Sequence, residues 1–320
     1  MNDNKTNLYE NDEENSYNSE NVITCENLVK IYKTKDTEVV ALQGLDLEIK
    51  YGEMMAIIGN SGSGKSTLLN MIGGLDRPSA GKLIVDGNNL LRMKKANLTA
   101  YKRKTIGFVW QNNARNLIPY LSAKQNVELP MILANRSDFR KRSAKLLKMV
   151  GLEERMKNKL SQLSGGEQQR VAIAIAMANE PQIILADEPT GAVDHKTGKQ
   201  IFNAFRKLNV ETGVTIIIVT HDRGVAKNVD RVVAISDGST SSEYIRKISY
   251  KEELEELDRS SGVEGSETHE ELVVVDRHGR LKLPEEYLHS VGIEKNSKIK
   301  MDVEKDKIVI YKQEEDKNEN

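Results

Sequence analysis

Residues 57–67 have the residue types and spacing of a phosphate-binding loop. An apolar run ends at Gly59, four residues separate it from Gly64, and Lys65 and Ser66 follow. Glycines let successive backbone N–H groups point at phosphate oxygens, and the helix expected after the loop adds the positive end of its dipole. Lys65 would reach the β- and γ-phosphates, and the Ser66 hydroxyl would coordinate Mg²⁺. A flexible Gly/Ser turn is the alternative. The apolar run before the loop and the helical pattern after it favour a nucleotide site built from Gly59, Asn60, Ser61, Gly62, Ser63, Gly64, Lys65, Ser66 and Thr67.

A second candidate anion site is the segment at residues 163–170, Leu-Ser-Gly-Gly-Glu-Gln-Gln-Arg. Ser164 and Glu167 have the spacing of a capping box, so a helix is expected to begin at Ser164. A bare helix N-terminus attracts anions. Capping explains the serine and the glutamate but not Gly165 and Gly166, because glycine in a helix costs stability. We infer a second surface that approaches phosphate closely.

Two expected strands end in side chains that can support phosphate chemistry. Residues 182–186 lead to Asp187 and Glu188, and residues 214–220 lead to His221. Ligands of open α/β sheets bind at the carboxyl ends of the strands. Asp187 would position Mg²⁺, Glu188 would polarise the attacking water and His221 would contact the γ-phosphate. A turn or a helix cap is the ordinary interpretation of Asp-Glu-Pro, and a lone histidine is more often structural. The phosphate loop makes the catalytic interpretation the more specific one.

The position of two further residues in the sequence does not decide whether they have a role in nucleotide binding. Gln111 closes the expected strand at residues 106–111, where a polar residue is usually just solvated. Tyr32 is either a half-buried strand aromatic or a ring on which adenine stacks. These alternatives stay open at this point.

The chain alternates short strands with helical segments, which predicts an α/β fold with a parallel sheet. Expected strands include residues 37–41, 45–49, 54–58, 82–85 and 231–236, and the periodicity is mostly helical from 122 to 151. Residues 1–21 have almost nothing to bury and are expected to form a disordered tail.

The composition excludes several classes of protein. The 320 residues carry a net charge of -1 from 47 basic and 48 acidic residues, so no global field favours nucleic acid or an anionic membrane. Cys25 is the single cysteine, which excludes an internal disulfide and suits a reducing compartment. No apolar run near the start predicts a signal peptide, and the longest apolar stretches, such as residues 171–178, are too short to span a bilayer. Any membrane role is expected to require a partner.

Over residues 22–244 the chain resembles the ATP-binding cassette (ABC) ATPases. The segment at 163–170 is the decisive match, because Ser-Gly-Gly in that setting marks this family among phosphate-loop proteins. Within the family the chain looks like the ATPase subunits of macrolide-export and lipoprotein-release transporters. The motifs that carry this resemblance are Gly73-Gly74-Leu75-Asp76-Arg77-Pro78, Asn116-Leu117-Ile118-Pro119, Asn126-Val127-Glu128-Leu129-Pro130 and Leu185-Ala186-Asp187-Glu188-Pro189-Thr190-Gly191.

The resemblance implies a cassette at residues 22–245 with an antiparallel β subdomain and a helical subdomain at about 112–178. It implies ATP and Mg²⁺ as cofactors and a head-to-tail dimer, in which Ser164, Gly165 and Gly166 of one copy face the phosphate loop of the other. Tyr32 matches the adenine-stacking aromatic, Gln111 the magnesium-sensing glutamine and Asp194 the residue that links the two sites. The remaining partner would be an integral-membrane permease, with the protein cytoplasmic and peripheral on the inner face of the membrane.

The sequence departs from the family pattern at three positions. Asn60 stands where relatives usually have proline, Ile175 replaces a common arginine and Val193 a common leucine. None of these changes removes a catalytic group, so an active ATPase is expected.

The C-terminal part has a separate pattern. A charged segment and a Ser/Gly/Glu linker at 246–271 precede a ββαββ pattern at 272–313, and residues 314–320 form a tail. This piece resembles the swapped-hairpin, AbrB-like domains, which are obligate dimers and often bind DNA. Residues 272–312 hold nine Lys and Arg against seven Asp and Glu, a net of +2 that is weak for tracking phosphates. Dimerisation is therefore favoured, and an ATP-dependent DNA-binding regulator is the alternative function.

Overall fold

The computed structural model describes residues 20–34, 37–111, 117–246, 269–275, 279–281, 283, 285–293 and 299–312. Most of the expected N-terminal tail, most of the linker at 246–271 and all of residues 314–320 lie outside the described residues. The α/β fold class expected from the sequence is confirmed.

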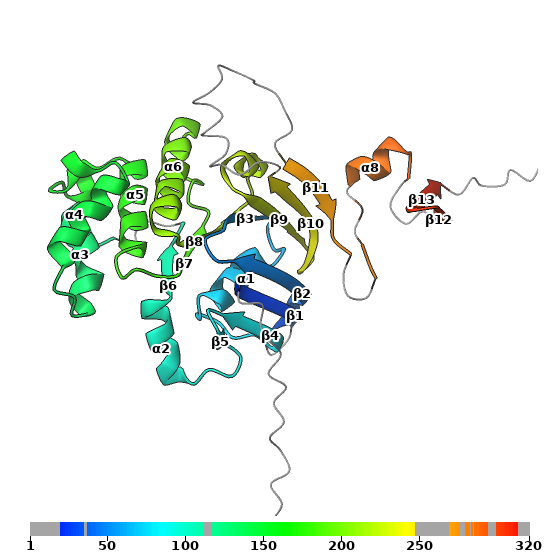
Figure 1. Ribbon diagram of the computed structural model, residues 1–320, viewed down its shortest axis with the longest axis horizontal. Coiled ribbons are helices and arrows are strands. Elements are labelled where there is room, and N and C mark those ends of the chain that lie inside the picture. The colour runs from blue at the N-terminus through cyan, green and yellow to red at the C-terminus, as the bar shows by residue number, and fades with distance from the viewer. Residues whose placement is uncertain are drawn as a thin grey trace, which may run out of the picture.

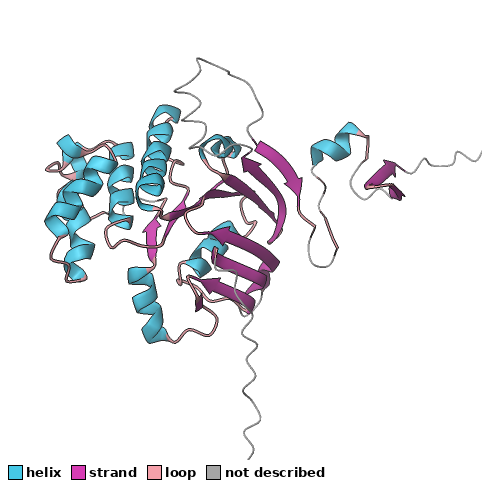
Figure 2. Cartoon of the chain, viewed as in Figure 1, coloured by secondary structure: helices cyan, strands magenta, loops and turns pink. Residues whose placement is uncertain are grey.

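A seven-stranded sheet forms the centre of the cassette, in the order β11-β10-β9-β3-β8-β7-β6. Five neighbouring strands are parallel: β6 (Ile106–Val109), β7 (Ile183–Asp187), β8 (Thr215–Thr220), β3 (Met54–Ile58) and β9 (Arg231–Ser236). Figures 1 and 2 show helices on one side of this sheet and a second sheet on the other. Burial on both faces explains why β3 and β8 read as unbroken apolar or β-branched runs.

The second sheet is antiparallel and has the order β2-β1-β4-β5. Its strands are β1 (Asn21–Lys33), β2 (Glu38–Lys50), β4 (Ala80–Val85) and β5 (Asn88–Asn89). Residues 37–41 and 45–49, expected as separate strands, belong to the single strand β2. The register between β1 and β2 shifts at Gly44, whose φ of 82° marks a bulge. This antiparallel sheet is the β subdomain that the sequence predicts.

Helix α1 (Lys65–Ile72) is held between the two sheets. Its Leu68 and Leu69 pack in one core cluster with Leu42 of β2 and Ile57 of β3. Alternate residues of β3 point the other way, so that Ala56 and Ile58 belong to the cluster under the remaining helices. The phosphate loop is thereby fixed to both layers of the cassette.

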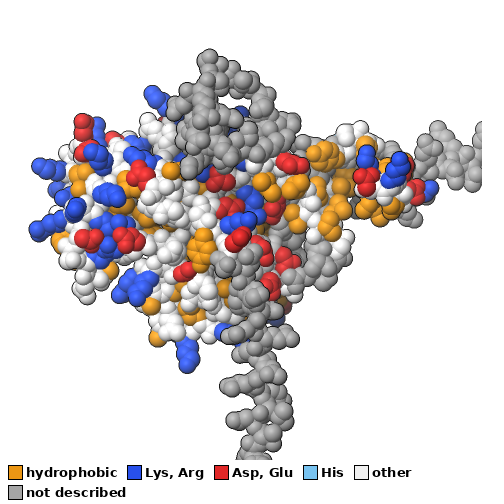
Figure 3. Space-filling view, viewed as in Figure 1, with side chains coloured by type: hydrophobic (Ala, Val, Ile, Leu, Met, Phe, Trp, Pro, Cys, Tyr) orange, Lys and Arg blue, Asp and Glu red, His pale blue; other side chains and the backbone are white. Residues whose placement is uncertain are grey.

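The helices of the other layer include α3 (Ala123–Leu133), α4 (Phe139–Met149), α5 (Gly165–Ala176) and α6 (His195–Thr212). The first three form the helical subdomain, with short 3-10 turns at η2 (Glu153–Arg155) and η3 (Leu160–Gln162), and η4 (Arg223–Asn228) follows β8. The sequence pattern does not predict α2 (Lys95–Lys104) or β10 (Ser239–Arg246), because both segments are dominated by polar residues. Lysine and arginine side chains gather over the helical subdomain at the left of Figure 3.

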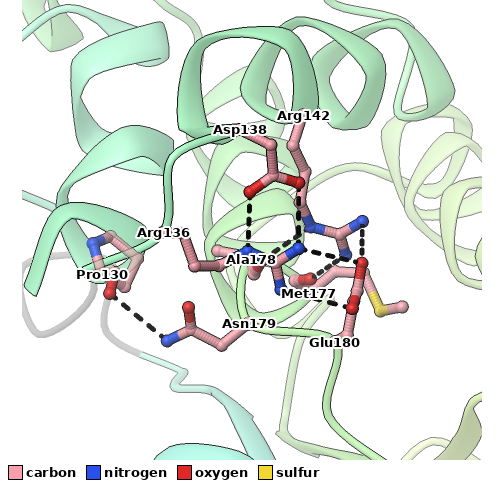
Figure 4. Close-up of polar contacts among 8 residues, drawn as sticks. All are labelled: Pro130, Arg136, Asp138, Arg142, Met177, Ala178, Asn179 and Glu180. Carbon is pink, nitrogen blue, oxygen red and sulfur yellow. Dashed lines mark hydrogen bonds and ion pairs between the residues drawn. The ribbon is translucent and has the colours of Figure 1, made fainter. Parts of the chain in front are cut away.

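An ion-pair cluster ties the helical subdomain to the segment that enters β7 (Figure 4). The Arg136 guanidinium contacts Asp138 at 2.9 Å and Glu180 at 3.2 Å, and Arg142 contacts Glu180 at 2.7 Å. Arg142 also donates to the carbonyl of Ala178 at 2.7 Å. The neighbouring Arg136 lowers the pKa of Asp138. These contacts connect the start of α4 with the strand that carries Asp187.

The described part of the C-terminal segment does not form one closed unit. β11 (His269–Val273) extends the main sheet by pairing antiparallel with β10 of the cassette. The remaining elements are α8 (Glu285–Ser290) and a hairpin of β12 (Ile299–Glu304) and β13 (Lys307–Lys312). β11 lies mostly in the expected linker and shares only Leu272 and Val273 with the ββαββ pattern expected at 272–313.

No helix among the described residues combines the length and the hydrophobicity needed to cross a bilayer.

Candidate functional site

The phosphate loop connects β3 to α1, so it lies at the carboxyl end of a central strand. Gly64 caps α1 with φ 101°, and a Cβ there would lie 2.5 Å from the carbonyl oxygen of Ala41. Gly62 has φ 80° and no atom within 4 Å of the position where a Cβ would be. Glycine is therefore required at both positions by the backbone conformation, and at Gly64 also by the approach of β2. The open space at Gly62 leaves its backbone accessible to a phosphate.

Lys65 is folded onto its own loop. Its ammonium donates to the carbonyl oxygens of Gly59 and Asn60, both at 2.8 Å, and lies 3.4 Å from the Ser63 hydroxyl. Burial lowers the pKa of Lys65, while Glu188 and Asp187 act in the opposite direction. The cation is thus already held at the loop, and a bound phosphate would compensate for its desolvation.

Ser66 and Asp187 form the part of the site that suits a divalent cation. The Ser66 hydroxyl lies 3.5 Å from Asp187 Oδ1, and Gln111 lines the same pocket. No cluster of three or more His, Cys, Asp or Glu side chains able to hold a metal occurs among the described residues. One carboxylate, one hydroxyl and one amide are oxygen donors of the kind that Mg²⁺ takes together with nucleotide phosphates. The residues fit Mg²⁺ bound jointly with phosphate.

Glu188 is fixed by the end of the neighbouring strand. Its Oε2 accepts from the Thr220 hydroxyl at 2.9 Å, and its Oε1 accepts from the backbone N–H of His221 at 2.9 Å. The His221 ring nitrogen Nδ1 lies 2.8 Å from the same oxygen. Glu188 itself has φ 46°, in the left-handed region that costs a non-glycine residue energy. The backbone strain and three donors together hold the carboxylate at one point.

These residues line one pocket of about 400 Å³, which we call the phosphate-loop pocket. It brings together Ser61, Gly62, Gly64, Lys65, Ser66, Thr67, Gln111, Asp187, Glu188 and His221 from distant parts of the sequence. Val39, Val40 and Ala41 of β2 also line it, and the sequence reading missed them together with Thr220. Thr220 directly precedes His221 at the same strand end, and this position would have predicted that it belongs to the site.

The predicted capping box at Ser164 is present. The Ser164 hydroxyl accepts from the N–H of Glu167 at 3.3 Å, and the Glu167 carboxylate accepts from the N–H of Ser164 at 2.8 Å. The Ser164 backbone and side chain thereby both act on the Glu167 carboxylate and lower its pKa, against burial, which raises it. Neither Ser164 nor the two glycines after it are among the residues that line the phosphate-loop pocket of the same chain.

The two glycines at this helix start differ in whether the surrounding structure leaves room for a side chain. A Cβ at Gly166 would lie 2.0 Å from Cγ2 of Thr197, whereas a Cβ at Gly165 would have no atom within 4 Å. Packing inside the chain therefore already requires glycine at Gly166, and the predicted contact of both glycines with a phosphate stays a prediction. Thr197 in turn bonds Asp194, which caps α6 with contacts of 2.6 and 3.0 Å. The start of α5 thus packs against Thr197, which in turn bonds the residue expected to link two sites.

Tyr32 lies on β1 and is 40% exposed. It pairs with Val39, which lines the phosphate-loop pocket. Tyr32 is therefore placed beside the pocket instead of in its lining.

The chain is similar to a known family and to several known proteins. The sequence matches the family described as ABC transporter over residues 42–191. It is 48% identical over 228 residues to the uncharacterized ABC transporter ATP-binding protein MJ0796 of Methanocaldococcus jannaschii, covering 69% of this chain and 96% of that protein. It is 44% identical to the macrolide export ATP-binding/permease protein MacB of Hyphomonas neptunium, covering 72% of this chain and 36% of that protein.

Among solved structures, the chain resembles the dimeric post-hydrolysis state of MJ0796 bound to ADP and Pi, with TM-score 0.63 and 47% identity. That match covers 70% of this chain and 98% of the other. The Clostridium perfringens protein cbiO1, part of an ABC transporter complex, matches with TM-score 0.64 and 31% identity. The resemblance of the C-terminal segment to AbrB-like domains has no support in these comparisons.

Identity of this extent over nearly the whole length of MJ0796, together with a phosphate loop, two carboxylates and a histidine in one pocket, assigns the chain. It belongs to the ABC transporter ATP-binding proteins, and its cassette is an ATPase of that family.

Proposed function

We propose that two copies of this protein enclose ATP head to tail and hydrolyse it to drive a separate membrane permease of the macrolide-export or lipoprotein-release type. One observation supports the dimer: Ser164 and Gly165 stand at a helix start with open space beside Gly165, and neither lines the phosphate-loop pocket of its own chain. The solved relative MJ0796 is described as dimeric, which supports the same arrangement here.

In this proposal each residue of the pocket has one task. The backbone of the loop and Lys65 hold the phosphates, and Ser66, Gln111 and Asp187 hold Mg²⁺, which would stabilise the charge that develops on them. Glu188 accepts a proton from the water that attacks the γ-phosphorus, and ADP leaves. The second copy adds the Ser164 hydroxyl and the open N–H groups at Gly165.

His221 has to satisfy two partners. With its Nδ1–H donated to Glu188, a neutral ring offers only a lone pair at Nε2. To donate to a γ-phosphate, the ring must either carry both protons or release Glu188. ATP binding would thus rearrange the contact between the histidine and the general base.

The Glu188→Gln variant tests both the base and the dimer. The amide cannot accept the proton, so ATP hydrolysis should fall by at least about 100-fold, while ATP still binds. Light scattering should then show a dimer with ATP and a monomer with ADP. Hydrolysis at the rate of the unmutated protein would refute the base assignment, and an ATP-bound monomer would refute the enclosed dimer.

The permease is proposed from the relatives. MacB proteins are described as ATP-binding/permease proteins, and this chain spans about a third of their length. Crosslinking in native membranes followed by identification of the partner tests this assignment. A polytopic permease supports it, and crosslinks confined to soluble proteins contradict it.

We also propose that the C-terminal hairpin pairs with the hairpin of the second copy. Met301 and Val303 on β12 and Ile308 on β13 share one face and are 62%, 77% and 69% exposed. An isolated two-stranded hairpin is marginal in water, and a cassette dimer would bring two such faces into one complex. The alternative of a DNA-binding regulator has no supporting observation. Sedimentation of the full chain, with and without Val303→Lys, tests the pairing, because an unchanged dimerisation constant would contradict it.

A further inference from the structure

Asp76 connects the exposed aromatic ring of Tyr32 to the phosphate loop. Asp76 lies in the segment after α1, and its Oδ2 accepts from the Tyr32 hydroxyl at 2.7 Å. The other oxygen, Oδ1, accepts from the Lys30 ammonium at 2.6 Å and from the backbone N–H of Arg77 at 2.7 Å. The bonds from Lys30 and Tyr32 hold strand β1 against the segment that leaves α1, and the bond from Arg77 fixes the carboxylate within that segment.

The ring of Tyr32 is oriented from a second direction. The Lys30 ammonium lies 4.7 Å from the ring centroid and is covered from solvent, since Lys30 is only 9% exposed. It also donates to the carbonyl oxygen of Arg77 at 2.8 Å. One face of the ring is therefore occupied by a cation, which leaves the other face for a flat ligand.

The same segment is tied to the phosphate loop. The backbone N–H groups of Leu75 and Asp76 donate to the carbonyl oxygen of Asn70 in α1 at 2.8 and 3.2 Å. Burial and the bond to Asp76 raise the pKa of the Tyr32 phenol, and the side chain of Thr67, in the first turn of α1, acts in the opposite direction. Tyr32 and the loop therefore have a fixed separation that does not depend on a bound nucleotide.

We infer that Asp76 is a positioning residue for nucleotide binding, which holds the Tyr32 ring at the place and angle where a nucleobase stacks while the phosphate loop holds the phosphates. This inference rests on the proposed role of Tyr32 as the adenine platform. The ring alone would rotate about its side-chain torsions, and each rotation would have to be arrested when the nucleotide binds. Because the Asp76 carboxylate already fixes the ring, nucleotide binding loses less side-chain entropy.

The test compares two probes with Mg²⁺ present: ATP, which has a base, and inorganic tripolyphosphate, which has none. In Asp76→Asn, the amide nitrogen that replaces a carboxylate oxygen cannot accept the hydrogen bond from the Tyr32 hydroxyl. Tyr32→Phe keeps the ring but lacks the hydroxyl. Each variant should weaken ATP binding about three- to tenfold, the range of one hydrogen bond, and leave tripolyphosphate binding unchanged. The loss should fall on the KM for ATP and not on kcat, and the double variant should be no weaker than either single one.

Glu26→Gln is the matched control, because Glu26 makes an ion pair with Lys82 in the same sheet at 3.1 Å and does not line the pocket. It should change neither affinity. The inference is overturned if Asp76→Asn binds ATP normally, or if it weakens tripolyphosphate as much as ATP. Tyr32→Phe loses one exposed hydroxyl and is expected to fold, so it decides the question even if the Asp76 variant is unstable. A Tyr32→Ala variant with normal ATP affinity would instead show that the adenine platform itself is wrong.

Discussion

Alanine substitutions of the two glycines at the start of α5 are expected to have opposite effects on stability. In Gly166→Ala the new Cβ would lie 2.0 Å from Cγ2 of Thr197, whereas carbon atoms in contact are about 3.5–4.0 Å apart. Thr197 cannot easily turn away, because its hydroxyl donates to Asp194 at 2.6 Å and its N–H donates to the same side chain at 3.0 Å. Either α5 or the start of α6 must therefore shift by about 1.5 Å, the difference between these separations.

Overpacking of this kind costs about 1–3 kcal/mol, and replacing glycine in a helix returns up to about 1 kcal/mol. We expect Gly166→Ala to lower the free energy of unfolding by about 1–2 kcal/mol and the midpoint of thermal unfolding by about 2–8 °C, given about 2–4 °C for each kcal/mol in a domain of this size. Urea and thermal unfolding of the full chain, followed by circular dichroism, measure both quantities.

Two further variants separate the steric argument from a general effect of alanine. A Cβ at Gly165 would have no atom within 4 Å, so the stability of Gly165→Ala should be unchanged or up to about 1 kcal/mol higher. Its ATPase activity should fall, because in the proposed dimer the new methyl group would stand between this helix start and the phosphate of the second copy. Adding Thr197→Ser to Gly166→Ala removes the clashing methyl group and keeps the hydroxyl on Asp194, so stability should return. Normal stability of Gly166→Ala, or no recovery in the double variant, would refute the reasoning.

Three other outcomes follow from the contacts described above. Glu180→Ala removes the carboxylate shared by Arg136 and Arg142 and should cost about 1 kcal/mol of unfolding free energy in urea, because the pairs are partly exposed; a loss that persists unchanged at high salt would contradict an ionic origin. Burial raises the pKa of Asp76, but bonds from Lys30, Tyr32 and Arg77 outweigh it and hold the pKa below the ordinary value of an aspartate. Its stabilisation is then complete above that ordinary value and is lost as the pH falls through the lowered pKa, so the stability difference between the unmutated protein and Asp76→Asn should shrink in acid. Chelation of divalent cations should stop hydrolysis and weaken ATP binding, since Ser66, Gln111 and Asp187 offer few ligands without phosphate; equilibrium binding with and without Mg²⁺ checks this, and equal ATP affinity would argue against a shared metal.

Local patterns in the sequence were sufficient for the parts of the site that depend on neighbouring residues. The loop before Lys65 and the helix start at Ser164 were predicted because backbone conformation and capping are set within a few residues. The ends of β7 and β8 were predicted because continuous apolar runs identify buried parallel strands. Where these segments come together, at Asp187, Glu188 and His221, the site follows from the rule that such strands end at one edge of the sheet.

Contacts between distant segments were decided only by the tertiary structure. Glycine is required at Gly166 because Thr197, 31 positions away in the sequence, lies against it. No local sequence pattern predicts this contact. The hydrogen bond from Tyr32 to Asp76 spans 44 positions, and it turns an ambiguous aromatic into an oriented ring. Likewise the pairing of β11 with β10 depends on which sheet edge is open, and the run His-Glu-Glu-Leu-Val has no alternation that would predict it. Side-chain type and local spacing identify the chemistry of this cassette, whereas the steric and hydrogen-bond partners that hold it in place are set by packing.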